Sequence, residues 1–331
     1  MSKISNIEYY LPQNILDNNQ LEKEFPEWDT EKIAEKIGIK RRHIAEKDQT
    51  ALDLGLRASE RLIETFDKDK IDFILLCTQS PDYFLPTGAC ILQDKLGLKK
   101  NIGALDFNLG CSGFVYGLAL AKGLIQANVA KNVLLITAET YSKHIHPKDK
   151  ANRSIFGDGA AACIVSESET EKIYDFELGT DGSGMNNIIV QNGGFRTKFN
   201  TQDTDIFEEG NFIRNNNNLF MNGPEIFNFT IANIPNLVNR ILAKHKLTIE
   251  TIDYVIFHQA NKFMLNYLRK KLKIVPEKFY QNMENTGNTV SASIPIALKD
   301  CINQNIVKPG DKILLCGFGV GYSWGATIIE L

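Results

Sequence analysis

Cys111, His258 and Asn288 are the side chains in this sequence whose types and settings favour covalent chemistry. Cys111 lies in the run LDFNLGCSGFVYGLALAKGLI, His258 in VIFHQAN and Asn288 in MENTGNTVSASIPIAL. A cysteine thiol is a nucleophile that forms thioesters, and a neutral imidazole and an amide are donors that stabilise negative charge developing on oxygen. Together the three side chains predict acyl transfer through a thioester on Cys111.

Cys111 is expected to lie at the start of a helix. Residues 104–108 are typical of a buried strand, Gly110 permits a sharp turn, and residues 113–128 continue as an apolar helix. The unpaired N–H groups and the positive end of the helix dipole predict a lowered thiol pKa at this position. The other cysteines are interpreted as small buried hydrophobic residues: Cys77, Cys90, Cys163, Cys301 and Cys316.

The composition describes a globular chain and excludes several classes of protein. The chain has 331 residues, 43% of them hydrophobic, and a net charge of −3, which suits one large core or two domains. No signal-peptide pattern and no apolar run of membrane-spanning length occur, so a cytoplasmic protein without a membrane partner is expected. The short basic clusters at 40–42 and 269–271 form no stripe for nucleic acid.

The cysteine and histidine pattern predicts no metal site. Six cysteines at irregular spacing, with no CxxC pair, favour reduced thiols over a disulfide framework or a zinc site. His144 and His146 stand next to Pro147 and Lys148, and this setting is interpreted as a solvated loop rather than a pair of metal ligands.

Two segments of strand length recur at a nearly constant separation. IDFILLCTQS at 71–80 is similar to IDYVIFHQAN at 252–261, and NVLLITAE at 132–139 is similar to KILLCGFG at 312–319. Ordered pairs at a constant offset indicate internal duplication. The chain is therefore predicted to contain two copies of one α/β unit.

Apolar runs of strand length alternate with helical stretches along the whole chain. Strands are predicted at 71–78, 104–108, 133–138 and 160–166, and helices at 52–66, 89–96, 113–128, 225–245 and 261–272. Pro235 is expected to bend or restart the helix that contains it. Such alternation predicts mostly parallel sheets covered by helices, divided into residues 1–170 with Cys111 and residues 171–331 with His258 and Asn288.

A polar insert, residues 191–218, separates the last predicted strand of the first part from the helices of the second. It is rich in Asn and Gly and includes NNNN at 215–218. Such a segment cannot bury much apolar area, so it is predicted to be a loop or lid. A surface insertion without a role in the site is an equally open alternative.

The ordered motifs NLGCSGF, FGDGAA, GTDGS, HQAN, GNTVSASIPIAL and GFGVGYSWG resemble the β-ketoacyl-[acyl-carrier-protein] synthase III branch of the thiolase superfamily. The resemblance covers nearly the whole chain. It implies a thiolase-like, five-layered αβαβα fold with two duplicated halves, a homodimer, and no metal or redox cofactor. It also implies that Cys111 is acylated by an acyl thioester, while His258 and Asn288 stabilise the enolate left when a malonyl thioester loses carbon dioxide.

The same resemblance implies substrate contacts for further residues. Gly319 and Val320 would lie in the loop that serves the oxyanion of the acyl-enzyme. Phe318 and Leu85 would line the primer pocket, with Leu85 contributed across the dimer. Coenzyme A or acyl carrier protein would be bound by Lys36, Lys150, Gly223, Phe227, Asn261, Lys270 and Lys271. A solvated helix face is an open alternative for the last two lysines.

Several positions depart from the family pattern. Lys32 and Lys36 stand where Trp and Arg are common, Lys150 replaces an Arg, Leu85 an aromatic residue and Val320 a Gly. Because Lys lacks the bidentate geometry of Arg, these changes favour a specialised pathway over acetyl-CoA priming of ordinary fatty-acid synthesis. Two alternatives stay open. One is an acyltransferase with an oxygen, nitrogen or non-malonyl carbon acceptor in polysaccharide or secondary-metabolite biosynthesis, and the other is a catalytically silent partner subunit.

Overall fold

Two sheets form the centre of the molecule, and the structure, a computed structural model, describes residues 1–27, 29–208 and 212–331. The first sheet has the strand order β1-β7-β6-β4-β5, and the second has the order β13-β14-β15-β8. The strands of the first sheet are β1 (Ser2–Tyr10), β4 (Phe73–Cys77), β5 (Gly103–Phe107), β6 (Asn132–Glu139) and β7 (Gly159–Glu167). Those of the second sheet are β8 (Ile173–Thr180), β13 (Tyr254–Phe257), β14 (Lys312–Gly319) and β15 (Ser323–Glu330).

The second sheet repeats four neighbouring strands of the first in order and direction. In the first sheet, β4 is parallel to β6, β6 is antiparallel to β7, and β7 is antiparallel to β1. In the second sheet, β13 is parallel to β14, β14 is antiparallel to β15, and β15 is antiparallel to β8. The segments that recur in the sequence lie on matching strands, because 132–139 forms β6 and 312–319 forms β14. The constant offset in the sequence therefore reflects two copies of one strand arrangement, to which β5 adds an edge strand.

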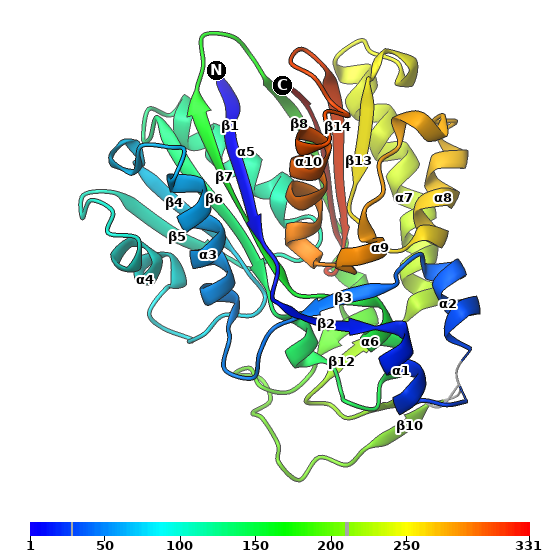
Figure 1. Cartoon of the computed structure of the whole chain (residues 1–331). Coiled ribbons are helices and arrows are strands. Elements are labelled where there is room, and N and C mark those ends of the chain that lie inside the picture. Colours follow the sequence, from blue (N-terminus) through cyan, green and yellow to red (C-terminus); the bar gives the residue numbers. More distant parts are fainter. Residues whose placement is uncertain (28, 209–211) are drawn as a thin grey trace.

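Helices form three layers around the two sheets (Figure 1). α5 (Gly113–Gln126) and α10 (Ser293–Asn303) pack between the sheets and contact strands of both. The outer layers are α3 (Ala51–Ile63) and α4 (Gly88–Lys95) over the first sheet, and α7 (Gly223–Lys244) and α8 (Lys262–Lys271) over the second. The order helix, sheet, helix, sheet, helix confirms the predicted αβαβα fold.

Smaller elements lie mostly at one end of these layers, at the bottom of Figure 1. Three short strand pairs form there, β2 with β3, β9 with β12 and β10 with β11. The strands are β2 (Asn14–Asp17), β3 (Arg41–Ile44), β9 (Ile188–Val190), β10 (Ile206–Glu208), β11 (Phe212–Arg214) and β12 (Leu219–Met221). The helices are α1 (Asn18–Glu24), α2 (Thr30–Ile37), α6 (Lys150–Ile155) and α9 (Met283–Thr286). The polar insert thus contains the pair β10–β11, and its residues 209–211 lie outside the described part of the chain.

The predicted strands and helices are present, with ends within three residues of those expected. α7 continues through Pro235 without a restart, so a bend is the part of the expectation for this residue that stays a prediction. Pro235 is buried next to Ile234 and Leu237, which pack into the apolar core of the second sheet. The side-chain amide of Asn233 also donates to the Phe229 carbonyl one turn earlier. Packing therefore outweighs the hydrogen bond that the proline cannot make.

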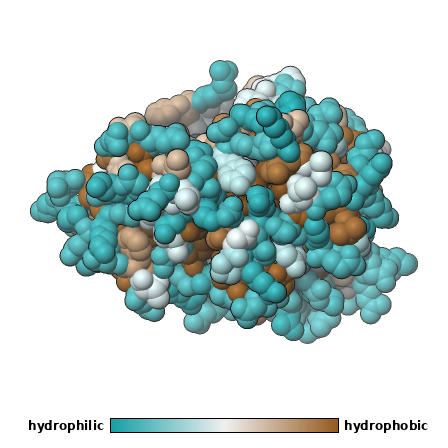
Figure 2. Space-filling model, turned by 90° about the horizontal axis from the view of Figure 1, so that it is seen from above, coloured by the Kyte–Doolittle hydropathy of each residue, from teal (hydrophilic) through white to brown (hydrophobic). Residues whose placement is uncertain are grey.

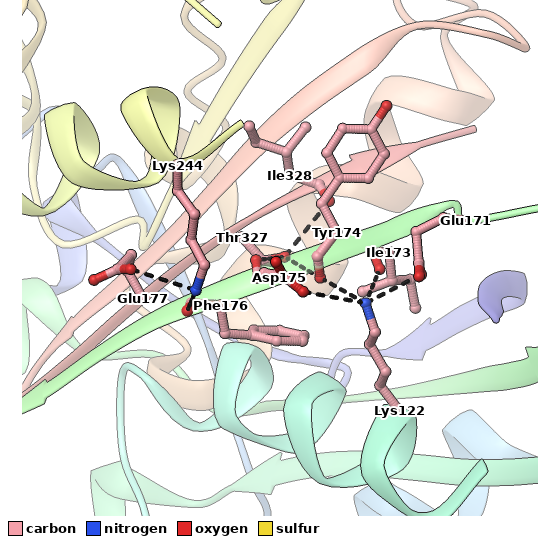
Figure 3. Close-up of polar contacts among 10 residues, drawn as sticks. All are labelled: Lys122, Glu171, Ile173, Tyr174, Asp175, Phe176, Glu177, Lys244, Thr327 and Ile328. Carbon is pink, nitrogen blue, oxygen red and sulfur yellow. Dashed lines mark hydrogen bonds and ion pairs between the residues drawn. The ribbon is translucent and has the colours of Figure 1, made fainter. Parts of the chain in front are cut away.

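A buried lysine joins α5 to the first strand of the second sheet (Figure 3). Lys122 Nζ donates to the carbonyl oxygens of Ile173 at 2.6 Å and Tyr174 at 3.1 Å, and lies 3.1 Å from Glu171 Oε1. Its side chain is only 7% exposed. Because burial strengthens charge-assisted hydrogen bonds, this contact fixes the end of α5 that lies far from Cys111.

The face seen in Figure 2 is mostly hydrophilic, with separate hydrophobic patches. Large apolar side chains are also exposed on the molecule, among them Phe84, Leu85 and Phe195. The rings of Phe84 and Phe195 contact each other with their centroids 5.4 Å apart. Among the residues that the structure describes, no helix has both the length and the apolar character needed to cross a membrane.

Candidate active site

Cys111 lies in the turn between β5 and α5, as the sequence predicts, and Ser112 is the N-cap residue of the helix. The thiol is only 9% exposed because the end of β14 covers it. A Cβ atom at Gly319 would lie 2.9 Å from the Cys111 Sγ, and one at Gly317 would lie 2.7 Å from the Cys111 carbonyl oxygen. Glycine at both positions therefore permits the close approach of β14 to the cysteine.

The predicted lowering of the Cys111 pKa is wrong for this structure. Burial raises the pKa of the thiol to about 12, and the nearby Glu139 carboxyl contributes in the same direction. The backbone N–H groups of Val320 and of Cys111 itself stabilise the thiolate and act against this rise. Desolvation of the sulfur thus outweighs its favourable position before a helix, and Cys111 is a thiol at neutral pH.

His258 follows β13 and is 2% exposed. Its backbone N–H donates to the Cys316 carbonyl at 2.8 Å, and its Nδ1 lies 2.8 Å from Ser293 Oγ. Burial lowers the pKa of His258 to about 3, so the ring is neutral at pH 7. When the Ser293 hydroxyl donates to Nδ1, the proton of the neutral ring is on Nε2, which then acts as a donor.

Asn288 presents a second donor beside the first. Its Nδ2 lies 3.5 Å from the Nε2 of His258, and its Oδ1 accepts the N–H of Val290 at 2.9 Å. Its backbone N–H donates to the Ile155 carbonyl, and its carbonyl accepts from Gly157 in the FGDGAA motif. With the His258 proton on Nε2, both nitrogens are donors, so they do not bond each other and both can donate to one acceptor oxygen placed between them.

Packing links the cysteine to these two donors. Cys111 and Val290 belong to one buried apolar cluster, and Val290 lies in the Asn288 turn. Phe318 is 2% exposed, and its ring meets the His258 ring edge-on with centroids 5.8 Å apart. The next residue along β14, Gly319, contacts the cysteine. The structure therefore gathers the predicted nucleophile and both donors around the end of β14.

Two polar residues of this region were not predicted from the sequence. Ser293 bonds His258 and is part of the GNTVSASIPIAL motif, so its position in a motif with Asn288 was the available signal. Glu139 ends the recurring segment 132–139, and its side chain is fully buried beside the Cys111 turn. Nothing in a single sequence distinguishes this carboxyl from one that caps a strand on the surface.

A groove of about 510 Å³ adjoins the buried cluster around Cys111. Ile155 and Met221 line the groove and also pack against that cluster. Gly223, the first residue of α7, forms part of the wall, and a Cβ there would meet no atom within 4 Å. Asp149, Ala151, Asn152, Arg214, Phe220, Asn222 and Pro224 complete the lining. The groove therefore lies next to the apolar cluster that contains Cys111.

The two lysines predicted to contact coenzyme A are both engaged. Lys150 Nζ lies 2.8 Å from Glu27 Oε1, and its side chain is 7% exposed. Lys36 Nζ lies 5.9 Å from the centre of the Phe263 ring. Phe227 packs against the same ring, with centroids 5.4 Å apart, so an aromatic cluster stands beside Lys36.

The residues predicted on α8 occupy its two ends. The Asn261 side chain accepts the N–H of Met264 at 2.9 Å and caps the helix, a structural role that the sequence analysis did not assign to it. Lys270 and Lys271 are exposed in the last turn. Cations there complement the negative end of the helix dipole and are also available to a partner.

Leu85 is 81% exposed in the single chain, and its place in the primer pocket across a dimer stays a prediction. Two other expectations need correction. Cys90 is exposed, whereas the other four cysteines interpreted as hydrophobic residues are buried. His144 and His146 are partly buried rather than solvated, and His146 Nε2 lies 3.4 Å from Asp205 Oδ1. No group of three or more His, Cys, Asp or Glu that could hold a metal occurs in the described ranges.

The fold and these side chains define an acyl-transferring enzyme of the condensing class. Residues 105–182 match the sequence model of 3-oxoacyl-[acyl-carrier-protein (ACP)] synthase III, and residues 242–331 match that of its C-terminal part. The β-ketoacyl-[acyl-carrier-protein] synthase III of Clostridium perfringens is 40% identical over 325 residues, which cover 97% of both chains. The chain therefore belongs to the 3-oxoacyl-[acyl-carrier-protein] synthase III family.

Solved structures agree with this membership. A crystal structure of a 3-oxoacyl-(acyl-carrier-protein) synthase III is 44% identical, with a TM-score of 0.98 over 100% of this chain and 99% of the other. The priming β-ketosynthase of the R1128 polyketide pathway is 25% identical, with a TM-score of 0.87 over 100% of this chain and 96% of the other. The family fold thus serves more than one kind of pathway.

Proposed function

We propose that the protein condenses an acyl primer with a malonyl-type thioester through an acyl-enzyme on Cys111. The observation that carries this proposal is the convergence of His258 Nε2 and Asn288 Nδ2, 3.5 Å apart, in a buried site packed against the cysteine. Neutral donors in a desolvated site stabilise a developing oxyanion more strongly than water does. A carboxyl group that departs as carbon dioxide leaves such an oxyanion behind.

In the first half-reaction, the Cys111 sulfur attacks the carbonyl carbon of an acyl thioester. A carbon–sulfur bond forms to Cys111, and the bond to the donor thiol breaks, so the donor leaves as a free thiol with the proton that Cys111 gave up. The backbone N–H groups of Cys111 and Val320, beside Gly319, would stabilise the oxyanion of this step. In support, both favour negative charge on the Cys111 sulfur.

In the second half-reaction, the malonyl thioester loses carbon dioxide and its carbonyl oxygen becomes an enolate oxygen. His258 and Asn288 donate to this oxygen. The enolate carbon then attacks the carbonyl carbon of the acyl-enzyme and a carbon–carbon bond forms. The bond to Cys111 breaks, and the departing thiolate takes a proton from solvent. Phe318 would pack against the bound acyl chain.

The thioester arm of coenzyme A or of acyl carrier protein would enter by the groove at Gly223. Lys150 would give up its ion pair with Glu27 and bind a phosphate group of the substrate. Phe227 and Lys36 lie on the same side of the molecule as this groove. Asn261 would act mainly through its cap on α8. Lys270 and Lys271 would meet an acidic carrier protein. The reaction as written uses neither a metal nor a redox cofactor, and a cytoplasmic location and a specialised pathway remain predictions from the sequence.

Mass spectrometry tests the proposal directly. Incubation with a panel of acyl-CoA and acyl-carrier thioesters is expected to add one acyl group per chain, and peptide mapping should place it on Cys111. Addition of malonyl thioester should then release carbon dioxide and give a β-ketoacyl product. A label on another cysteine, or none with any donor, would contradict the proposal. Acylation without decarboxylation of any malonyl donor would favour the alternative acyltransferase.

We also propose a homodimer whose two halves per chain are residues 1–170 and 171–331. β5 is an edge strand of the first sheet, and exposed apolar side chains lie at Phe84, Leu85 and Phe195. Burying an unpaired edge and such a surface against a second copy is the usual solution. Light scattering at micromolar concentration should give the mass of two chains, and Leu85→Asp should shift it toward one. A single-chain mass for the unaltered protein would sink the proposal.

A further inference from the structure

Glu139 is a buried carboxyl group that no step of the proposed reaction uses. It ends β6 and is 0% exposed. Its contacts in the described part of the chain are with a backbone N–H and two hydroxyls, and none is with a lysine or an arginine. Removing a carboxyl from water without a cation is unfavourable, so such a group is a candidate for a role in the site. Burial raises its pKa to about 8, so Glu139 is mainly a neutral acid at pH 7.

On one side, Glu139 holds the turn that aims Asn288. Ser291 Oγ donates to Glu139 Oε1 at 2.9 Å. Ser291 follows Val290, whose φ of 54° lies in the left-handed region that β-branched residues rarely adopt. The N–H of Val290 fixes the Asn288 amide, whose Nδ2 then lies 3.5 Å from His258. The bond to Glu139 therefore supports a strained turn at the point where it sets the direction of a donor.

On the other side, Glu139 holds the turn that leads to the nucleophile. The backbone N–H of Gln79 donates to both carboxyl oxygens, at 3.3 and 3.1 Å. The Gln79 side chain donates to Asn108 Oδ1 at 3.0 Å, and a Cβ at Gly110 would lie 2.6 Å from its Oε1. Gln79 thus packs directly on the residues that precede Cys111.

We propose that Glu139 is a positioning residue of this site, a buried carboxyl group whose hydrogen bonds tie the turn aiming Asn288 to the turn leading to Cys111. This inference rests on the proposed condensing function and extends it to a group outside the reacting atoms. Its neutrality matters because a negative charge on Glu139 opposes formation of the thiolate on Cys111. The titratable groups that face Glu139 directly or through Ser80 are Cys77, Cys111, Tyr141, His144 and Asp158.

Glu139→Gln and Glu139→Leu separate the effect of the hydrogen bonds from the effect of the charge, and Ser291→Ala tests one hydrogen bond alone. Glu139→Gln keeps the shape and a neutral group with one acceptor and one donor end, so it should retain decarboxylation and condensation at pH 7 within about twofold. Glu139→Leu removes every hydrogen bond and should lower kcat for decarboxylation by about tenfold or more, with KM for the malonyl thioester little changed. Ser291→Ala cuts only the link to Asn288 and should lower decarboxylation while Cys111 acylation is retained.

Alkylation of Cys111 by iodoacetamide reports on the charge and needs no substrate. At about pH 7, where Glu139 is neutral, the unaltered protein and Glu139→Gln should react at the same rate. Above about pH 8, Glu139 ionises and holds back the thiolate, so Glu139→Gln should react faster, with a Cys111 pKa shifted downward. Asp106→Asn is the matched control, because Asp106 also accepts backbone N–H groups, those of Gly88 and Ala89, and should leave this profile unchanged.

Each outcome decides the inference. Identical alkylation profiles for the unaltered protein and Glu139→Gln, or full decarboxylation by a folded Glu139→Leu variant, would overturn it. If Glu139→Leu does not fold, Glu139→Gln and Ser291→Ala still supply the charge and hydrogen-bond readouts. If the unaltered protein releases no carbon dioxide from any malonyl donor, the proposed function fails, whereas the alkylation profile still tests the link between Glu139 and Cys111.

Discussion

Replacing Asn288 with Ala should reduce the release of carbon dioxide from a malonyl thioester by about 10²-fold or more, while acylation of Cys111 stays measurable. The Asn288 amide nitrogen lies 3.5 Å from His258 Nε2, and in the proposed mechanism both donate to the enolate oxygen. Loss of one such donor from a dry site removes about 3 kcal/mol of transition-state stabilisation. Acylation should be spared because, in the proposed mechanism, its oxyanion is stabilised by backbone N–H groups beside Cys111 and not by Asn288.

His258→Ala should behave in the same way, since its Nε2 is the other donor. Because burial lowers the pKa of His258 to about 3, the ring stays neutral at all pH values well above this. Decarboxylation should therefore show no loss that is due to His258 as the pH falls from about 8 to 5. Asn236→Ala, on the surface of α7, is the matched control and should leave both half-reactions unchanged.

Radiolabelled malonyl thioester measures carbon dioxide release, and intact mass measures acylation on the same samples. A folded Asn288→Ala or His258→Ala variant with unchanged carbon dioxide release would remove that side chain from the proposed mechanism. Equal loss of acylation and decarboxylation would instead indicate that the two half-reactions share one oxyanion site.

The arrangement of elements could be predicted from the sequence because local patterns encode it. The run from 104 to 128 changes from a strand to a helix at Gly110, and the structure has β5 and α5 there with Cys111 between them. The recurring segments at a constant offset likewise correspond to equivalent strands of two sheets. Periodicity and turn residues act over short distances, so a single sequence displays them.

What could not be predicted depends on burial and on contacts between distant segments. Proximity to a helix start predicted a low pKa for Cys111, but β14, about 200 positions later, covers the sulfur and reverses the direction. Glu139 and Ser291 lie far apart in the sequence, and their bond exists only because β6 and the Asn288 turn meet in the fold. The spacing of residues along a single sequence does not indicate that two such distant segments are in contact.

The ion pair of Lys150 is a second contact that could not be predicted from the sequence. Its type and place in the sequence predict a cation that binds phosphate, yet Glu27, from the N-terminal segment, lies 2.8 Å from its Nζ. A buried cation needs a partner, and which carboxylate supplies it is decided by the packing of α6 against the N-terminal segment. In its described residues, the polar insert forms the short strands β10 and β11, in keeping with a polar, Asn-rich stretch that cannot build a core. Whether it acts as a lid stays a prediction.

Replacing Cys111 with Ala should abolish condensation, lowering it by about 10⁴-fold or more. The acyl-enzyme cannot form without the sulfur, and the remaining donors stabilise charge but cannot carry the acyl group. Decarboxylation of malonyl thioester should continue in this variant, because His258 and Asn288 remain in place. Cys111→Ala therefore removes the nucleophile and leaves the two donors in place, whereas Asn288→Ala removes a donor and leaves the nucleophile in place.

Cys77→Ala is the matched control, because Cys77 is a second buried cysteine in the same region. Its thiol donates to the Leu109 carbonyl at 3.1 Å, and a Cβ at Gly113 would lie only 2.3 Å from its sulfur, so it packs against the first residue of α5. Burial raises the pKa of Cys77 well above its usual value, so it is a poorer nucleophile. Cys77→Ala should keep acylation and condensation. If condensation survives in Cys111→Ala and the acyl label is found on Cys77, then Cys77 and not Cys111 is the nucleophile.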